Sequence, residues 1–112
     1  MRSDRERLLD IQEAIAKIEQ YANQGREAFE KDELIQVWIL HHLQIIGEAA
    51  SAMSEALSQK YNRVPWQDMA DFRNVLVHEY FRIDLDIIWE IVKKQIPNLK
   101  KQIVEILSEV RE

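Results

Sequence analysis

The chain has 112 residues and a formal net charge of -5, with 46% of its residues hydrophobic and 31% charged. Domains of about 100–150 residues are common, so we expect one domain over residues 1–112, and the balance of apolar and charged residues excludes intrinsic disorder. The absence of cysteine excludes disulfides, thiolate zinc sites and a cysteine nucleophile, while the acidic charge argues against broad contact with nucleic-acid phosphates.

Residues 3–25 have the pattern of an amphipathic helix. Ser3 and Glu6 have the spacing of a capping box, in which two side chains bond to backbone N–H groups at the start of a helix. Apolar residues follow at three- and four-residue spacing, and Gly25 is a stop signal. The charged residues 26–31 are predicted to connect this helix to the next.

The second predicted helix begins at Asp32, which can cap it, and extends to about Gln59. Its apolar residues form two neighbouring stripes. Together the stripes make an apolar face that is wider than contact with one other helix requires. We therefore expect the helix to lie at the centre of a bundle or to contact a second subunit as well.

Pro65 separates this helix from a third, over residues 66–81, because proline suits the first turn of a helix and disfavours helix in the residue before it. Asp84 or Asp86 caps a fourth helix, which Pro97 ends or kinks before the apolar pattern continues to the C-terminus. The sequence thus predicts an all-α fold, an antiparallel bundle of four helices, or of five if the last is kinked.

The sequence has no segment typical of membrane insertion or export. It contains no uninterrupted run of eighteen apolar residues, and its first residues lack the apolar part of a secretion signal. We therefore expect a soluble, cytoplasmic protein with no membrane contact. A glycine-rich phosphate loop is also missing, which excludes nucleotide hydrolysis of the P-loop type.

The densest group of reactive side chains lies at residues 71–80. Arg73 can bind phosphate through its planar guanidinium, and His78 can accept and donate a proton near neutral pH. Together they suit cleavage of a phosphodiester without a metal, and in RNA the adjacent ribose hydroxyl can attack. By spacing alone, such a pair is more often a surface ion pair and a hydrogen-bonded histidine than a catalytic site.

The helical repeat places these two residues in different directions. A separation of five residues rotates Arg73 and His78 by about 140°, so one chain does not easily bring both to one phosphate. Asn74, four residues before His78, shares its face and can orient the imidazole. A two-fold dimer would bring Arg73 of either chain to His78 of the other, so we predict a composite site at a dimer interface.

Other polar residues have less specific signals. Glu48 is costly to bury alone, so it either faces solvent or holds Arg73 in an ion pair. His41 and His42 are adjacent and point to different faces, and no further ligand has the spacing of a helical zinc pair. Tyr80 is expected at the edge of the core, or as a modifiable phenol beside the site. We predict no metal and no cofactor.

Four short motifs occur in order along the chain. They are IGEAA at 46–50, VPW at 64–66, RNVLVHEY at 73–80 and IPNL at 96–99, with Trp89 between the last two. This ordered set resembles the HepT-like branch of the HEPN superfamily over nearly the whole chain. The core motif of that family is an Arg, four residues, a His, one residue and a Tyr, and it falls without gaps on Arg73, His78 and Tyr80.

The resemblance implies a dimeric, metal-independent ribonuclease in which Arg73 and His78 act across the dimer cleft and Asn74 supports them. It implies the toxin of a type VII toxin–antitoxin system, with RNA such as a tRNA or an mRNA as substrate. The implied partner is a minimal nucleotidyltransferase antitoxin of the MntA-like kind, which would transfer AMP from ATP to Tyr80. The added phosphate would compete with RNA phosphate through its charge and volume.

Two other functions also fit the sequence. The chain can be a non-catalytic helical module that docks a minimal nucleotidyltransferase, or a purely structural helical dimer. Replacement of His78 with alanine distinguishes these two functions from a ribonuclease, because loss of growth inhibition with an intact fold indicates an enzyme.

Overall fold

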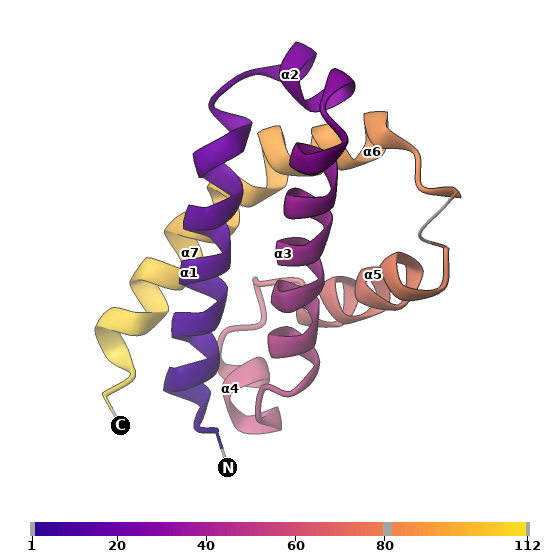
Figure 1. Ribbon diagram of the computed structural model, residues 1–112. Coiled ribbons are helices and arrows are strands. Elements are labelled where there is room, and N and C mark those ends of the chain that lie inside the picture. Colours follow the sequence, from indigo (N-terminus) through magenta and orange to yellow (C-terminus); the bar gives the residue numbers. More distant parts are fainter. Residues whose placement is uncertain (1, 80–81, 112) are drawn as a thin grey trace.

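The elements that the structure describes are all helical, as predicted. The computed structural model describes residues 2–79 and 82–111. In chain order the elements are α1 (Asp4–Ala22), α2 (Arg26–Lys31), α3 (Glu33–Ser51), α4 (Glu55–Lys60), α5 (Trp66–His78), α6 (Leu85–Glu90), a π-helical turn (Ile91–Gln95) and α7 (Ile96–Glu109). Figure 1 shows α1 and α3 side by side and antiparallel, with α7 passing behind α1. None of the described helices has the length and apolar character needed to cross a membrane.

The start of α1 follows from its local sequence. The backbone N–H of Glu6 donates to the Ser3 hydroxyl at 3.1 Å, and the backbone N–H of Ser3 donates to the Glu6 carboxylate at 2.9 Å. The predicted capping box is therefore present. The hydrogen bond from the Ser3 backbone N–H to the charged carboxylate holds the pKa of Glu6 below its ordinary value.

The segment 26–31, predicted to be a connector, is instead the short helix α2. Its one buried side chain is Phe29, which has no exposed surface. The ring of Phe29 stacks on Trp89 of α6, with 5.3 Å between the ring centroids. A tertiary contact far along the chain therefore holds α2 in place, and the local charge pattern gave no sign of it.

The second predicted helix is also shorter than expected, because α3 ends at Ser51 and not near Gln59. A new helix, α4, begins after Ser54, whose hydroxyl accepts a hydrogen bond from the backbone N–H of Leu57 at 3.2 Å. Serine competes with helical hydrogen bonding in this way and is a favoured helix cap. The cap starts a separate helix, although the apolar pattern continues through both helices and predicts only one.

The last helices follow the prediction more closely. The third predicted helix corresponds to α5, and residues 80 and 81 lie outside the described residues. Asp84, rather than Asp86, caps α6 by accepting a hydrogen bond from the Asp86 backbone N–H at 2.9 Å. Pro97 does not end the helix: a π-helical turn precedes it, and its wider bonding accommodates a residue that has no N–H.

The side chain of His42 is polar and buried, with 8% of the residue exposed. Its Nδ1 lies 2.7 Å from the carbonyl oxygen of Trp38. Burial lowers the pKa of His42 below its ordinary value of 6.5. On acidification the unfolded chain therefore binds a proton before the folded chain does, and protein stability falls.

We accordingly expect the free energy of unfolding to fall below about pH 6.5, by at most about 1.4 kcal/mol per pH unit from this group. The measurement is urea unfolding at a series of pH values. His42→Gln should remove this part of the pH dependence, whereas His41→Gln, at an exposed neighbour, should keep it. Equal pH dependence in the wild type and His42→Gln would contradict the assignment.

Candidate functional site

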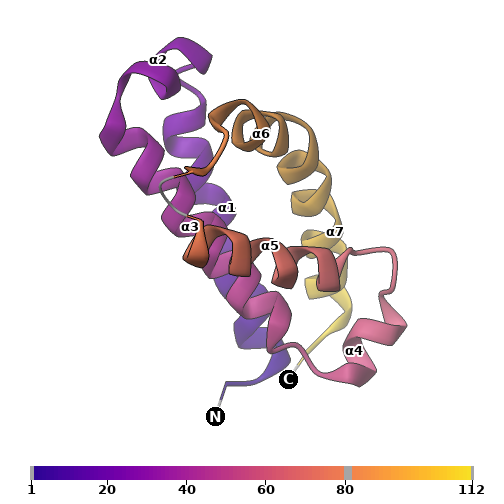
Figure 2. The same ribbon diagram turned by 90° about the vertical axis from the view of Figure 1, so that its right-hand side faces the viewer.

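Helix α5, which carries the core motif, lies across the outside of α3, as Figure 2 shows. Its buried residues are Trp66 and Leu76, out of 13 in the helix. The remaining side chains are exposed or half-buried. A helix with so little buried surface is available for contact with another molecule.

Arg73 lies where α5 crosses α3. A Cβ atom placed on Gly47 of α3 would lie 2.3 Å from the Arg73 Cβ and 2.8 Å from the carbonyl oxygen of Met69. Both distances are too short for any side chain, so glycine is required for this close crossing. This role of Gly47 was not predicted from the sequence, although the small residues of the IGEAA motif are a signal of close helix contact.

The guanidinium of Arg73 has two polar neighbours. Its Nη1 donates to the side-chain oxygen of Asn74 at 3.1 Å, and its Nη2 lies 3.8 Å from a carboxylate oxygen of Glu48. Nε is buried and makes no hydrogen bond to the described residues. The ion pair with Glu48 is long and partly exposed, so it orients Arg73 more than it stabilises the fold. The guanidinium therefore keeps donors for a phosphate.

Asn74 does not make the contact that its spacing suggests. The sequence indicates that its amide can orient His78, but the described hydrogen bond of that amide runs to Arg73. Asn74 is exposed, as is Glu48 on the neighbouring helix. Both side chains thus surround the guanidinium and not the imidazole.

His78 is the last residue of α5 and is exposed. Arg73, in contrast, lies against α3, and its side chain is 37% exposed. The two side chains leave the helix in different directions, in agreement with the rotation between them on a helix. Tyr80, the third residue of the motif, lies outside the described residues.

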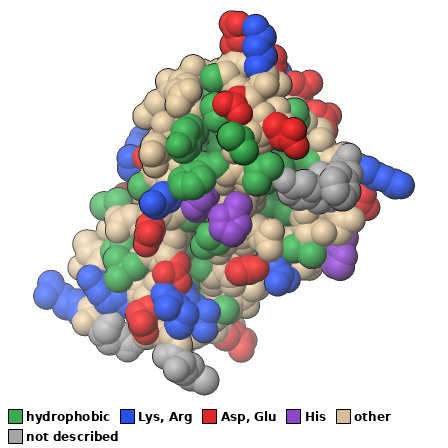
Figure 3. Space-filling view, in the orientation of Figure 1, with side chains coloured by type: hydrophobic (Ala, Val, Ile, Leu, Met, Phe, Trp, Pro, Cys, Tyr) green, Lys and Arg blue, Asp and Glu red, His purple; other side chains and the backbone are tan. Residues whose placement is uncertain are grey.

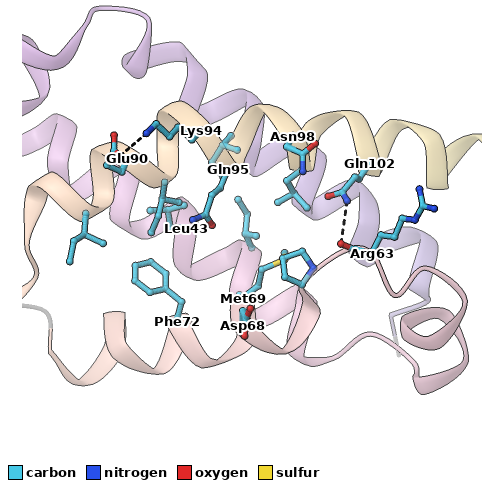
Figure 4. Close-up of a pocket in the computed structure, with 17 residues that line it drawn as sticks. Leu43, Arg63, Asp68, Met69, Phe72, Glu90, Lys94, Gln95, Asn98 and Gln102 are labelled. Carbon is cyan, nitrogen blue, oxygen red and sulfur yellow. Dashed lines mark hydrogen bonds and ion pairs between the residues drawn. The ribbon is translucent and has the colours of Figure 1, made fainter.

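A groove of about 720 Å³ lies on another side of α5, between that helix and the α6–α7 segment. Figure 4 shows Met69 and Phe72 of α5 facing it, with Leu43 of α3 beside them. Neither Arg73 nor His78 lines this groove. Among residues 2–79 and 82–111, no three His, Asp or Glu side chains are grouped so that they could hold a metal ion.

Comparison with known proteins places the chain in a family. A family model described as "Ribonuclease HepT-like" matches residues 11–106. A protein of Caldanaerobacter subterraneus subsp. tengcongensis named "Putative RNase" is 39% identical over 98 residues, which cover 88% of each chain. A protein of Thermococcus cleftensis named "Probable ribonuclease HepT" is 37% identical over 100 residues, covering 88% of this chain and 91% of that one.

One relative is a longer protein. It comes from Methanocaldococcus jannaschii, is named "Gamma-glutamylcyclotransferase and putative RNase" and is 38% identical over 101 residues. The match covers 89% of this chain and 46% of that protein, so the chain spans about half the length of this relative. No solved structure gives a significant match. On the family match over most of its length, the chain belongs to the HepT-like ribonuclease family, a group of RNA-cleaving hydrolases.

Proposed function

We propose that the chain is the toxin of a type VII toxin–antitoxin system and cleaves RNA without a metal ion. It acts as a homodimer in the cytoplasm, on a tRNA or an mRNA. Each site combines Arg73 of one protomer with the partner's His78. The observation that carries the proposal is the placement of Arg73 against α3 and of His78 on the exposed end of α5.

The chemistry follows from the two side chains. The neutral imidazole of His78 removes the proton from a ribose 2′-hydroxyl, whose oxygen attacks the adjacent phosphorus. The bond from phosphorus to the 5′-oxygen breaks, and an imidazolium returns a proton to that oxygen. The products are a 2′,3′-cyclic phosphate and a 5′-hydroxyl. Arg73 donates hydrogen bonds to the non-bridging oxygens, where negative charge grows in the transition state.

Glu48 and Asn74 act as positioning residues in this proposal. Both contact the guanidinium of Arg73, and neither contact uses all of its donors. Arg73 is thus directed before the substrate arrives, which reduces the entropy lost on binding a phosphate.

Control of the toxin is proposed to act on Tyr80. An MntA-like nucleotidyltransferase antitoxin transfers AMP from ATP to the phenol oxygen and releases pyrophosphate. Tyr80 is two residues after His78 in the sequence. An adenylyl group attached there carries negative charge to the end of α5, where it repels and displaces the RNA phosphate.

The test uses the purified chain, shown by mass to carry no AMP, and total RNA in EDTA. We expect cleavage with 2′,3′-cyclic phosphate ends. Prior incubation with the antitoxin and ATP should add AMP and stop cleavage by the wild type, but should do neither to Tyr80→Phe. Cleavage that requires a divalent cation would contradict the mechanism, and inhibition of Tyr80→Phe would contradict the modification site.

A further inference from the structure

The groove between α5 and the α6–α7 segment has the features of a ligand site, and it is called the α5–α7 groove below. Its volume of about 720 Å³ is within the range of pockets that bind small organic groups. Met69 and Phe72 line it from α5, and Ile87, which is 54% exposed, lines it from α6. Phe72 is half-buried, so part of its side chain is accessible. An accessible aromatic ring in an apolar groove offers a surface on which another flat ring can stack.

A polar group also points into the α5–α7 groove. Apolar side chains are exposed elsewhere on the molecule, as Figure 3 shows beside the histidines, so exposure alone does not mark a ligand site. Part of the groove is formed by the π-helical turn Ile91–Gln95, and such turns are rare and frequent at functional sites. Figure 4 shows the side chain of Gln95 extending toward α5, without a hydrogen bond to the other residues drawn. Its amide therefore offers a donor and an acceptor to a ligand.

The charged residues that line the α5–α7 groove balance each other. Lys94 pairs with Glu90, with 3.0 Å between Nζ and the carboxylate oxygen. Arg63 and Asp68 line the groove as well. Two cations and two anions leave no net charge to attract a phosphate. The groove thus favours a neutral, flat ligand with hydrogen-bonding groups at its edge, and a nucleobase has these properties.

The α5–α7 groove adjoins the residue proposed to bind phosphate. Gly47 lines the groove, and a Cβ atom placed on it would lie 2.3 Å from the Arg73 Cβ. Phe72 directly precedes Arg73, and successive residues of a helix are turned by about 100° from each other. A ring at Phe72 and a phosphate at the guanidinium would therefore occupy neighbouring sides of α5. The base and the phosphate of one nucleotide are joined in a comparable way, through the ribose.

We propose that the α5–α7 groove binds one unstacked base of the RNA substrate, which stacks on Phe72 and forms hydrogen bonds with Gln95. The inference rests on the proposed function, because it assigns the groove to the nucleotide whose phosphate Arg73 holds. Single-stranded RNA is commonly recognised in this way, with bases stacked on aromatic side chains and hydrogen-bonded at their edges. Phe72 and Gln95 thereby determine which nucleotide lies next to the bond that is cleaved.

The test measures binding of uncleavable RNA analogues to the full chain by fluorescence anisotropy. The probes are labelled 2′-O-methyl hexamers of A, C or U, which lack the attacking hydroxyl, and a hexamer of the same backbone without bases. All probes carry the same phosphates, so differences in the dissociation constant report the contribution of the bases. We expect at least one base-containing hexamer to bind about 5- to 150-fold more tightly than the abasic hexamer, the usual effect of stacking one base.

Variants separate binding of the base from binding of the phosphate. Phe72→Leu keeps an apolar side chain and removes the aromatic ring, and Gln95→Ala removes the amide at an exposed position. Both should weaken binding of the preferred hexamer and leave binding of the abasic hexamer unchanged. Arg73→Ala should weaken binding of both probes. The matched control is Gln20→Ala, at an exposed glutamine of α1 outside the groove, and it should bind both probes as the wild type does.

The outcomes distinguish failure of the base site from failure of the proposed function. A wild type that binds no base-containing hexamer more tightly than the abasic one would overturn the base site and leave the ribonuclease intact. Retention of the full preference by both groove variants would do the same. Failure of the AMP-free wild type to cleave total RNA in EDTA would overturn the proposed function itself, on which the base site depends.

Discussion

Alanine in place of His78 is expected to lower the rate of RNA cleavage by about 10²–10⁴-fold, the usual contribution of a general acid–base group. His78 is exposed at the end of α5, so the variant should fold as the wild type does. The measurement is the rate of cleavage of RNA in EDTA, together with thermal unfolding of both proteins. Unchanged cleavage by His78→Ala would exclude the imidazole from the mechanism. Absence of cleavage by an AMP-free wild type would favour the non-catalytic module that docks a nucleotidyltransferase.

Mixed dimers separate a composite site from a site within one chain. Arg73→Ala and His78→Ala should each be inactive alone. When they are co-expressed in equal amounts, about a quarter of the wild-type activity should return, since half of the dimers are mixed and each holds one intact site of two. Mixed dimers without activity would place both residues in the site of a single chain.

Alanine in place of Gly47 is expected to lower the free energy of unfolding by about 1–3 kcal/mol, the usual cost of inserting atoms into a packed contact. Alanine favours helix over glycine by about 1 kcal/mol, so the contact must outweigh this gain. The added Cβ meets the Arg73 Cβ and a backbone oxygen, neither of which can rotate away. Helix α5 must then move from α3 and carry Arg73 with it. The measurement is urea unfolding, followed by the RNA cleavage assay.

Ser51→Ala, at an exposed position one turn further along α3, is the matched control. It should change the free energy of unfolding by no more than about 0.5 kcal/mol, as is usual for surface positions. If Gly47→Ala proved as stable as the wild type or more stable, helix propensity would be the larger effect and the close crossing of α3 and α5 would be wrong.

The accuracy of the predicted helices depends on whether the signal is local. The start of α1 was predicted because Ser3 and Glu6 cap it through contacts within one turn. The end of α3 was not, because Met53 and Leu57 are buried and continue the apolar pattern beyond the end of the helix. The spacing of apolar residues indicates which side chains are buried, but it does not indicate whether a single helix carries all of them.

In the candidate site, too, only the features with a local signal could be predicted from the sequence. The directions of Arg73 and His78 follow from the helical repeat, which the sequence contains. The role of Gly47 depends on where a second helix crosses, and the partner of Asn74 depends on side-chain rotamers. Neither is encoded in the spacing of residues along one helix.

The contact of Phe29 with Trp89 has a consequence for folding. It joins residues 60 positions apart, and the ion pair of Arg26 with Asp86, at 2.5 Å, joins the same two helices. The Phe29–Trp89 contact therefore cannot form until α6 has been synthesised. Contacts of such long sequence separation form late and slow the search for the native state. Helix α2 thus couples the two halves of the chain into one cooperative unit.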